Sequence, residues 1–424
     1  MRLKLNKDLR MVLILGGISS IIWIVFRGPI IHPDSWSYIA AIDSVFNGVP
    51  DWFRTPVYPT FLALLKWVFG ENLYLWATIV IQHLVFLCSV VCLFRLCQKA
   101  INSDTISFWI TLFYAVYPYI SSLNSYIVTE SFSISGTVFL LFLALRLKEN
   151  GMWKDALLLM TQLAFLLLLK PALVYLVPLL IVLWVYTFFM EGKRKSALLG
   201  IAGVIVAGFC LVSYMQVFKK QYGVFSASVV STLNNYHIAR TYGLLKPELI
   251  ENPAVRADLE KSIEINGECP KDIYLLYNEA VQMVQDHSMQ TIGHEVSICM
   301  RYSPINSLKA LIFRLYSSAD DPLLVKGIDA SQWGHLLCFH ISTLYLFLLI
   351  YTILLVLWFI RRRSIPWFTA LIYMVGVSQI IVSVIAAQWD WGRLLLPALP
   401  AYLLMIGQVC QIITIKSLHS LEFV

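Results

Sequence analysis

Long apolar stretches separated by short polar segments run through almost the whole chain. Most of them approach the roughly 20 residues that an α-helix needs to cross the hydrocarbon core of a membrane. The pattern therefore predicts an all-α polytopic membrane protein with about ten transmembrane helices. The stretches lie at about residues 11–27, 76–94, 106–123, 130–147, 155–169, 172–190, 197–217, 336–360, 366–387 and 394–415.

The stretches 155–169 and 172–190 are the least clear part of this pattern. Both are short, and Lys170 and Pro171 lie between them. Proline breaks a continuous helix, and the 36 residues from 155 to 190 are too many for a single span. We therefore expect two spans joined by a tight turn, with a re-entrant pair as the alternative.

The positive charges support this number of spans and orient them. The chain begins with a basic segment, and no small-x-small cleavage site follows the first apolar stretch. We therefore expect an uncleaved first span with the N-terminus in the cytoplasm. With spans alternating from there, sixteen Lys and Arg residues fall in cytoplasmic segments and five in the short outer segments. This is the bias expected of a membrane protein. A missed span would exchange the inner and outer sides of all later segments and remove the bias.

Two predicted outer segments divide the chain. An N-terminal transmembrane module covers 1–217 and contains the first outer loop, 28–75; an extracytoplasmic insert covers 218–335; the C-terminal transmembrane helices cover 336–424. The insert is more polar than its surroundings, and its stretch 271–300 has apolar residues at helical spacing. We expect the insert to be a small, mainly helical cap.

The first outer loop is too polar at its start to span the membrane and too apolar to be fully solvated. Residues 34–42 have the pattern of an amphipathic helix that lies on the membrane surface. Residues 57–69 predict a second, short interfacial helix that ends at Gly70. The loop should therefore place two surface helices beside the outer end of the first span.

The composition excludes an ordinary soluble domain. Hydrophobic residues make up 59% of the chain and charged residues 13%, whereas a soluble domain carries about 25% charged residues. The net charge of +7 is explained by the cytoplasmic Lys and Arg residues, so it does not indicate a nucleic-acid partner. The partners expected from composition alone are membrane lipids.

Cys269 and Cys299 are the two cysteines that lie well inside the predicted insert. The outer side of a membrane is oxidising, and a pair there can form a disulfide. The sequence leaves open whether these two are paired or free. No set of Cys and His residues has the spacing of a zinc site, so no metal site is predicted from the residues.

Charged groups close to the membrane are costly and are functional candidates. Asp34 follows a proline at the start of the first surface helix, where it is either a helix cap or a general base in a water-poor site. Arg54 lies between prolines and either reaches toward lipid headgroups or binds a phosphate bidentately. Asp43 lies about 180° from Asp34 around the helix and is better explained as part of a solvated face.

Three further charged residues lie near the predicted outer ends of later spans. Glu130 starts the fourth span, where an acid is favourable at a helix N-terminus, and we expect it to point into the bundle. Lys170 and Arg393 stand in the outer turns. Arg393 either pairs with Asp390 or, with Arg54 and Lys170, surrounds one anionic headgroup.

Four sequence blocks, in this order, resemble the C-type glycosyltransferase superfamily. The closest resemblance is to the bacterial relatives of protein O-mannosyltransferases and of lipid A aminoarabinose transferase. Each block alone is weak evidence, whereas the ordered set, spread over most of residues 30–400, is fairly specific. The blocks are Pro33-Asp34-Ser35 with Tyr38 and Ala41; Arg54-Thr55-Pro56-Val57-Tyr58-Pro59 with the following Phe61 to Leu65; Val128-Thr129-Glu130-Ser131; and Gly392-Arg393 with Pro397 and Pro400.

The resemblance implies a donor sugar carried on a polyprenyl phosphate and an acceptor lipid, glycan or protein on the outer face of a bacterial plasma membrane. It places Asp34 at the catalytic acid position and Arg54 at the position that touches the lipid phosphate. Many members have two adjacent acids in the first motif, whereas here Ser35 follows Asp34. The use of a divalent metal therefore stays open, and no cofactor is assigned.

These residues predict a single in-line displacement with inversion at the anomeric carbon. Asp34 would act as general base, and Arg54, Arg393 and Lys170 would stabilise the departing phosphate. The supporting residues would be Glu130, Tyr58 and Asp43. A secondary transporter or lipid flippase is the alternative, as is a polymerase or ligase of polyprenyl-linked polysaccharide; a transporter would show internal repeats, and none is evident.

Overall fold

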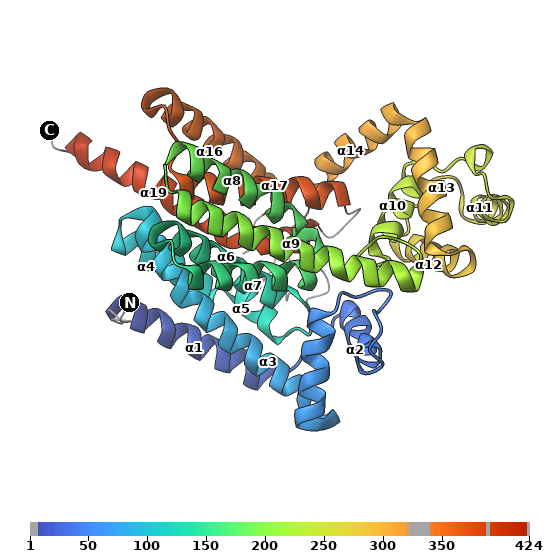
Figure 1. The fold of residues 1–424 in the computed structure, drawn as a ribbon, viewed down its shortest axis with the longest axis horizontal. Helices are drawn as coiled ribbons and strands as arrows, with labels where there is room; N and C mark the ends of the chain where they lie inside the picture. Colours follow the sequence, from blue (N-terminus) through green and yellow to red (C-terminus); the bar gives the residue numbers. More distant parts are fainter. Residues whose placement is uncertain (1–6, 320, 322–339, 387–390, 422–424) are drawn as a thin grey trace.

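The computed structural model describes residues 7–319, 321, 340–386 and 391–421. Within these ranges the chain forms α-helices and short 3-10 turns. The β-type pairing there is an isolated bridge between Ile30 and Tyr126. Long helices run side by side in one bundle, and a group of shorter helices projects from one of its ends (Figure 1). The structure is therefore that of an all-α polytopic membrane protein, as the sequence predicts.

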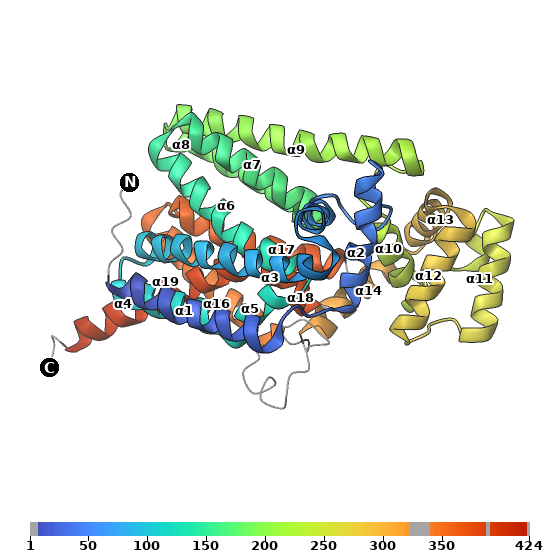
Figure 2. The same ribbon diagram turned by 90° about the horizontal axis from the view of Figure 1, so that it is seen from below.

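The bundle consists of helices whose outer faces carry many exposed Leu, Ile, Val and Phe side chains. Both termini of the drawn chain lie at the end opposite the projecting helices (Figures 1 and 2). The helices are α1 (Lys7–Arg27), α3 (Val57–Ile101), α4 (Asp104–Val116), α5 (Pro118–Ser122), α6 (Glu130–Asn150), α7 (Trp153–Leu169), α8 (Leu176–Met190), α9 (Arg194–Tyr222), α16 (Ile341–Arg362), α17 (Trp367–Ala386), α18 (Trp391–Leu395) and α19 (Leu399–Leu421), with 3-10 turns η1 (Leu123–Ser125), η2 (Pro171–Tyr175) and η4 (Leu396–Ala398).

The predicted apolar stretches correspond to these helices. Among the described residues, eight helices are long and apolar enough to cross a membrane, and the bent pair of α4 with α5–η1 makes a ninth. Helix α7 has 17 residues, which is slightly below the usual length of a span. The chain leaves α7 at Leu169 and starts η2 at Pro171, so 155–190 forms two helices joined by a tight turn, as predicted.

The first outer loop contains the two predicted helices. Helix α2 (Pro33–Phe46) starts with a capping box in which the His32 side chain accepts from the Asp34 backbone N–H and the Ser35 hydroxyl accepts from the His32 backbone N–H. Residues 57–69 form the first part of α3, which bends at Gly70, where φ is 73° and ψ is 175°. A positive φ is accessible to glycine at little cost, and it turns the chain from the first part of α3 into its long apolar part. The position of the first part on the membrane surface stays a prediction.

The insert is mainly helical. The chain forms α10 (Val230–Thr241), η3 (Pro247–Leu249), α11 (Pro253–Asn266), α12 (Ile273–His287), α13 (Met289–Tyr302) and α14 (Pro304–Ser318). Apart from α14, these helices share a second hydrophobic core, separate from that of the bundle, to which α12 and α13 contribute Ala280, Met283, Ile292 and Val296. We call the part with this core, residues 223–302, the cap. The limits 218 and 335 stay a prediction, and 322–335 lie outside the described residues.

The disulfide considered for Cys269 and Cys299 is not formed. Both thiols are free. Cys299 points into the core of the cap, whereas Cys269 is exposed in the connection between α11 and α12. Cys299 lies on the buried face of α13, and its sulfur is therefore not bonded to that of Cys269.

Close packing between α8 and α9 depends on a glycine. The Trp184 ring on α8 is fully buried and lies 5.3 Å from the Trp367 ring on α17. A Cβ atom at Gly200 on α9 would lie 2.4 Å from two carbons of the Trp184 ring. Three helices can therefore meet around one indole only because position 200 has no side chain.

We expect Gly200→Ala to destabilise the protein by about 1–3 kcal/mol, because the indole has no room to move in a close-packed core. The measurement is thermal unfolding of the purified protein in detergent. Gly17→Ala is the matched control, since nothing lies within 4 Å of a Cβ atom there, and it should be neutral or stabilising. Equal unfolding temperatures for both variants would contradict the packing argument.

Candidate functional site

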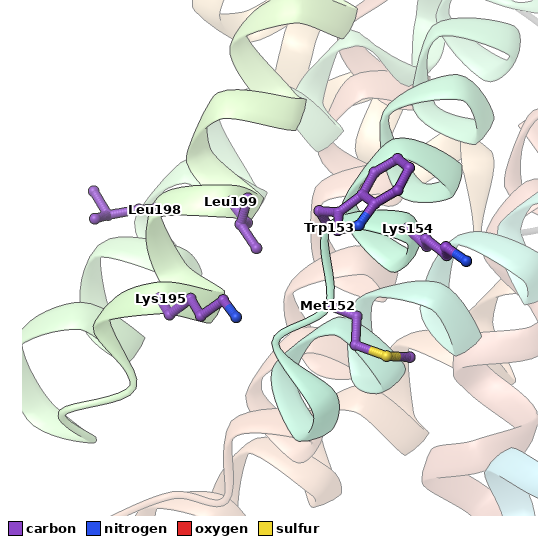
Figure 3. A pocket seen from close by; sticks show the side chains of 6 residues that line it. All are labelled: Met152, Trp153, Lys154, Lys195, Leu198 and Leu199. Atoms are coloured by element: carbon purple, nitrogen blue, oxygen red, sulfur yellow. The ribbon is translucent and has the colours of Figure 1, made fainter.

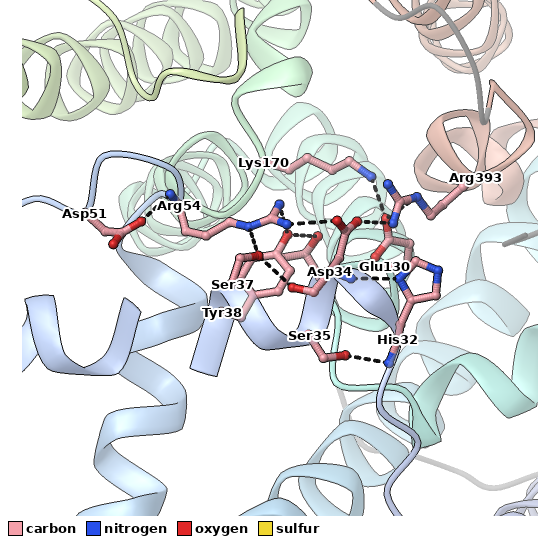
Figure 4. A network of polar contacts seen from close by, with 11 residues as sticks. His32, Asp34, Ser35, Ser37, Tyr38, Asp51, Arg54, Glu130, Lys170 and Arg393 are labelled. Atoms are coloured by element: carbon pink, nitrogen blue, oxygen red, sulfur yellow. Dashed lines mark hydrogen bonds and ion pairs between the residues drawn. The ribbon is translucent and has the colours of Figure 1, made fainter. Parts of the chain in front are cut away.

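A network of charged side chains lies at the end of the bundle that carries the cap. We call it the ion-pair network; its members are Asp34, Arg54, Glu130, Lys170 and Arg393 (Figure 4). These residues come from α2, the segment before α3, the start of α6, the turn between α7 and η2, and α18. Five segments that are distant in the sequence therefore meet at one place.

Asp34 lies in the first turn of α2 and is the centre of this network. Its Oδ1 accepts from a guanidinium N–H of Arg54 at 3.0 Å, and its Oδ2 accepts from Nη1 of Arg393. Burial acts to raise the pKa of Asp34, but the positive charges of Arg393 and Arg54 outweigh it and hold this pKa well below its ordinary value. The carboxylate is therefore ionised and held between two guanidinium groups.

Hydrogen bonds and two aromatic rings orient the Arg54 side chain. The Asp51 carboxylate accepts from the Arg54 backbone N–H at 2.7 Å and fixes the loop before α3. The Nε atom of Arg54 donates to the Ser37 hydroxyl at 2.7 Å, and Nη1 donates to the Tyr38 hydroxyl at 3.2 Å. The guanidinium carbon also lies 4.1 Å from the centre of the Tyr38 ring and 4.7 Å from that of Phe53. These contacts hold the guanidinium in a single orientation.

Glu130 holds the other half of the network. It starts α6 and is buried, and its carboxylate accepts from the Lys170 ammonium at 3.1 Å. The Nε atom of Arg393 lies 3.7 Å from the same oxygen, so Arg393 bridges Glu130 and Asp34. Glu130 thus points into the bundle, as expected from its place at the start of an apolar helix.

Three cations and two carboxylates make up the ion-pair network. Asp34 pairs with Arg54 and Arg393, and Glu130 pairs with Lys170 and lies near Arg393. The side chains of the three cations are between 12% and 17% exposed, whereas that of Asp34 is 31% exposed. The site is therefore partly dehydrated, and Asp34 is its most accessible charged group.

The other predicted site residues are placed differently. Tyr58 is buried behind the network, where its ring packs edge-on against Tyr38 at 5.1 Å and its hydroxyl donates to Gln82. Asp43 is exposed, which agrees with a solvated face, and its supporting role stays a prediction. Asp390, the alternative partner of Arg393, lies outside the described residues.

Several contacts of the site were not predicted from the sequence. Tyr38 was named only as part of the first sequence block and Ser37 not at all, although both follow Asp34 at helical spacing on α2. Tyr277 of the cap packs edge-on against Phe53, with ring centroids 6.4 Å apart, and burial raises the pKa of its hydroxyl. Only the fold brings α12 to Phe53, and no local pattern signals it.

The donor atoms of the network do not fit a divalent cation. Both oxygens of Asp34 accept from guanidinium groups, and Glu130 is held by Lys170 and Arg393. In the described ranges no group of three or more His, Cys, Asp and Glu residues is placed to hold a metal ion. We therefore assign no metal-dependent step to this site.

A separate surface hollow of about 480 Å³ lies at the opposite end of the bundle, between the first turns of α7 and α9 (Figure 3). Its walls combine apolar side chains with two lysines. Because α6 separates this end from Glu130, the hollow is not part of the ion-pair network. The residues that line it are Met152, Trp153, Lys154, Lys195, Leu198 and Leu199.

Comparison with solved structures shows the same fold in an archaeal oligosaccharyltransferase. The chain matches the Archaeoglobus fulgidus enzyme in its complex with Zn and sulfate with a TM-score of 0.53 and 13% identity over 96% of this chain and 49% of the other. It matches AglB from the same organism, in complex with an inhibitory peptide and a dolichol-phosphate, with a TM-score of 0.53 and 11% identity over 99% and 52%. A third structure, tethered to an acceptor peptide containing the NVT sequon, gives a TM-score of 0.54 and 12% identity over 95% and 49%.

These matches show that the chain shares its fold with the archaeal oligosaccharyltransferase. The chain spans about half the length of the oligosaccharyltransferases that it matches. No protein-family model and no curated protein sequence matches it. The predicted closeness to the O-mannosyltransferase and aminoarabinose transferase branch stays a prediction.

We expect Glu130→Gln to destabilise the protein by about 3–5 kcal/mol, because it leaves the buried charges of Lys170 and Arg393 without their shared carboxylate. Glu71→Gln is the control, since the Glu71 side chain is 71% exposed in its pair with Lys66 and an exposed pair contributes little. Thermal unfolding of both variants in detergent is the measurement. If the two lose equal stability, the network does not hold these segments together.

Proposed function

We propose that this protein is a membrane glycosyltransferase that moves a sugar from a polyprenyl-phosphate donor to an acceptor at the membrane surface. The observation that carries the proposal is the convergence of Arg54, Lys170 and Arg393 on Asp34 and Glu130 at one end of the bundle. The shared fold with oligosaccharyltransferases, one of them solved with a dolichol-phosphate, supports the same chemistry.

The donor phosphate would bind where three cations converge. A sugar phosphodiester carries one negative charge, and it would compete with the Asp34 carboxylate for the two guanidinium groups. Arg54 and Arg393 both present guanidinium groups beside Asp34, and guanidinium matches phosphate oxygens in a bidentate manner. The lipid tail would lie along the apolar outer surface of the bundle, next to the helices of the first outer loop.

Asp34 would act as the general base once the donor is bound. In the structure its pKa is held low by Arg393 and Arg54 despite burial, which makes it a weak base while both guanidinium groups pair with it. A phosphate that draws these groups away removes the cause of the lowered pKa, and burial then raises the pKa toward the operating pH. Donor binding would thus activate the base that the transfer needs.

The transfer would be a single displacement. Asp34 takes the proton from the acceptor nucleophile, the nucleophile attacks the anomeric carbon, and the bond between that carbon and the phosphate oxygen breaks. The electron pair leaves with the phosphate, where Arg54, Arg393 and Lys170 stabilise the growing charge. Because Glu130 is buried among cations, the described network offers no second carboxylate as covalent nucleophile, so the anomeric configuration inverts.

The acceptor would approach from the cap. Phe53 and Tyr277 form an aromatic edge beside Arg54, and aromatic faces suit a sugar ring or an amphipathic acceptor. Residues of the cap, rather than those of the bundle, would select the acceptor, whether it is a lipid, a glycan or a protein. With the basic N-terminus in the cytoplasm, the site faces the outer side of a bacterial plasma membrane.

We expect Asp34→Asn to lower turnover by about 10²–10⁴-fold, because the general base is lost. Binding of polyprenyl phosphate should persist, since the cations remain and a competing carboxylate is gone. The measurement is sugar transfer from a polyprenyl-phosphate donor in reconstituted vesicles, with thermal stabilisation by polyprenyl phosphate as the binding assay. Asp43→Asn, on the exposed face of the same helix, is the control and should transfer normally. Normal turnover by Asp34→Asn would refute the proposed role.

We expect Arg54→Lys to weaken binding of polyprenyl phosphate about tenfold or more, because an ammonium keeps the charge but loses the bidentate geometry. Arg27→Lys is the control, because Arg27 ends α1 as an exposed residue outside the network. Equal affinities of the two variants would show that the phosphate does not contact Arg54.

A further inference from the structure

Helix α14 has the opposite distribution of side chains from that of a helix in a soluble domain. Its buried stripe consists of Ala310, Arg314 and Ser318. Its exposed stripe consists of large apolar or aromatic residues spaced at three, four, three and one positions, which places them on one face. They are Ile305, Leu308, Ile312, Leu315 and Tyr316, between 47% and 73% exposed.

Contacts fix the depth of this helix relative to the spans. The Arg314 guanidinium donates to the Ile385 backbone carbonyl at 2.9 Å, at the end of α17. The Ser318 hydroxyl is bonded to the Tyr345 hydroxyl at 2.6 Å, and the Ser342 backbone N–H donates to the Ala319 carbonyl, both in the first turns of α16. The C-terminal half of α14 is therefore attached to the ends of two helices that are long and apolar enough to cross a membrane.

Both helices to which α14 is attached also expose large apolar side chains. Ile381 and Ile385 on α17 are each 51% exposed, and Leu346 and Leu349 on α16 are each 59% exposed. Leu311 packs against the core of the bundle, whereas the Phe313 ring lies 5.9 Å from the Tyr242 ring of the cap. Helix α14 thus runs from α13 of the cap to the end of α17 (Figure 1), and its exposed stripe is covered by neither.

We propose that α14 lies in the plane of the membrane with its exposed stripe inserted among the acyl chains of phospholipids, at the end of the bundle that carries the ion-pair network. The stripe and the spans then meet one continuous hydrocarbon boundary. Lys309 and Tyr316 lie beside or on this stripe and can reach the headgroup level with their polar ends.

The same helix is connected to the ion-pair network. Asp321 follows α14, and its carboxylate accepts from the Gly392 backbone N–H at 3.3 Å. Gly392 precedes Arg393, which pairs with Asp34. Lipid contact on α14 would therefore help to position the turn that carries Arg393. This inference does not rest on the proposed enzymatic function, because it follows from exposure and from attachment to the spans.

Photocrosslinking of the full-length protein tests it. Ile312 is replaced by p-benzoylphenylalanine, and the protein is reconstituted in vesicles of phosphatidylethanolamine and phosphatidylglycerol with a radiolabelled phosphatidylethanolamine. The control is the same replacement at Ile265 of α11, which is 70% exposed against 58% for Ile312 and lies on the part of the cap far from the bundle (Figures 1 and 2).

We expect at least about fivefold more lipid label at position 312 than at position 265. The crosslinker labels lipid only where it lies among acyl chains, whatever its exposure in the protein alone. A second replacement at Leu308, on the same stripe, should behave like that at Ile312 and covers the case in which one variant fails to fold. Equal labelling of the stripe and of position 265 would overturn the proposal. So would crosslinks from the stripe to a second copy of the chain in place of lipid.

Discussion

One carboxylate held between two guanidinium groups joins segments from both ends of the chain. Asp34 pairs with Arg54 across a single loop and with Arg393 across 359 positions of sequence. A partly buried charge without a partner is costly, and more so beside a membrane. Helix α2, the segment before α3 and helix α18 must therefore meet at the same end of the bundle, and the remaining helices are arranged around that requirement.

Glu130 and Lys170 extend the same constraint into the interior. Their pair lies at the start of α6 and at the turn between α7 and η2, and Arg393 connects it with Asp34. The result is a cluster in which each carboxylate is shared by two cations. Under the proposed function, a donor phosphate would take the place of the Asp34 carboxylate at the guanidinium groups. The low pKa of Asp34 and the close approach of its two guanidinium partners are thus two consequences of one arrangement.

Turns of the chain beside the network are part of this arrangement. Gly70 bends α3 between its first part, residues 57–69, and its long apolar part, and Arg54 lies in the segment just before this first part. Asp321 follows α14 and connects that helix with the segment that carries Arg393. The two arginines that hold Asp34 are therefore both carried by short segments beside helix ends.

Local patterns in the sequence determined the helices, their approximate limits and their exposed faces. Apolar length identified the spans, Pro171 separated α7 from η2, Gly70 ended the surface helix, and helical periodicity placed Asp43 away from Asp34. Each of these depends on neighbouring residues alone, because backbone geometry and the length of a membrane crossing are local constraints.

Long-range contacts were decided by the tertiary structure. The sequence suggested that Arg54, Lys170 and Arg393 share one side of the membrane, but not that Arg393 bridges Asp34 and Glu130, that Ser37 and Tyr38 orient Arg54, or that Cys269 and Cys299 stay apart. Ion pairs form between whichever charges the packing of distant helices brings within a few ångströms. That packing depends on the volumes of many side chains at once, such as the indole of Trp184 beside Gly200, and no single stretch of sequence contains it.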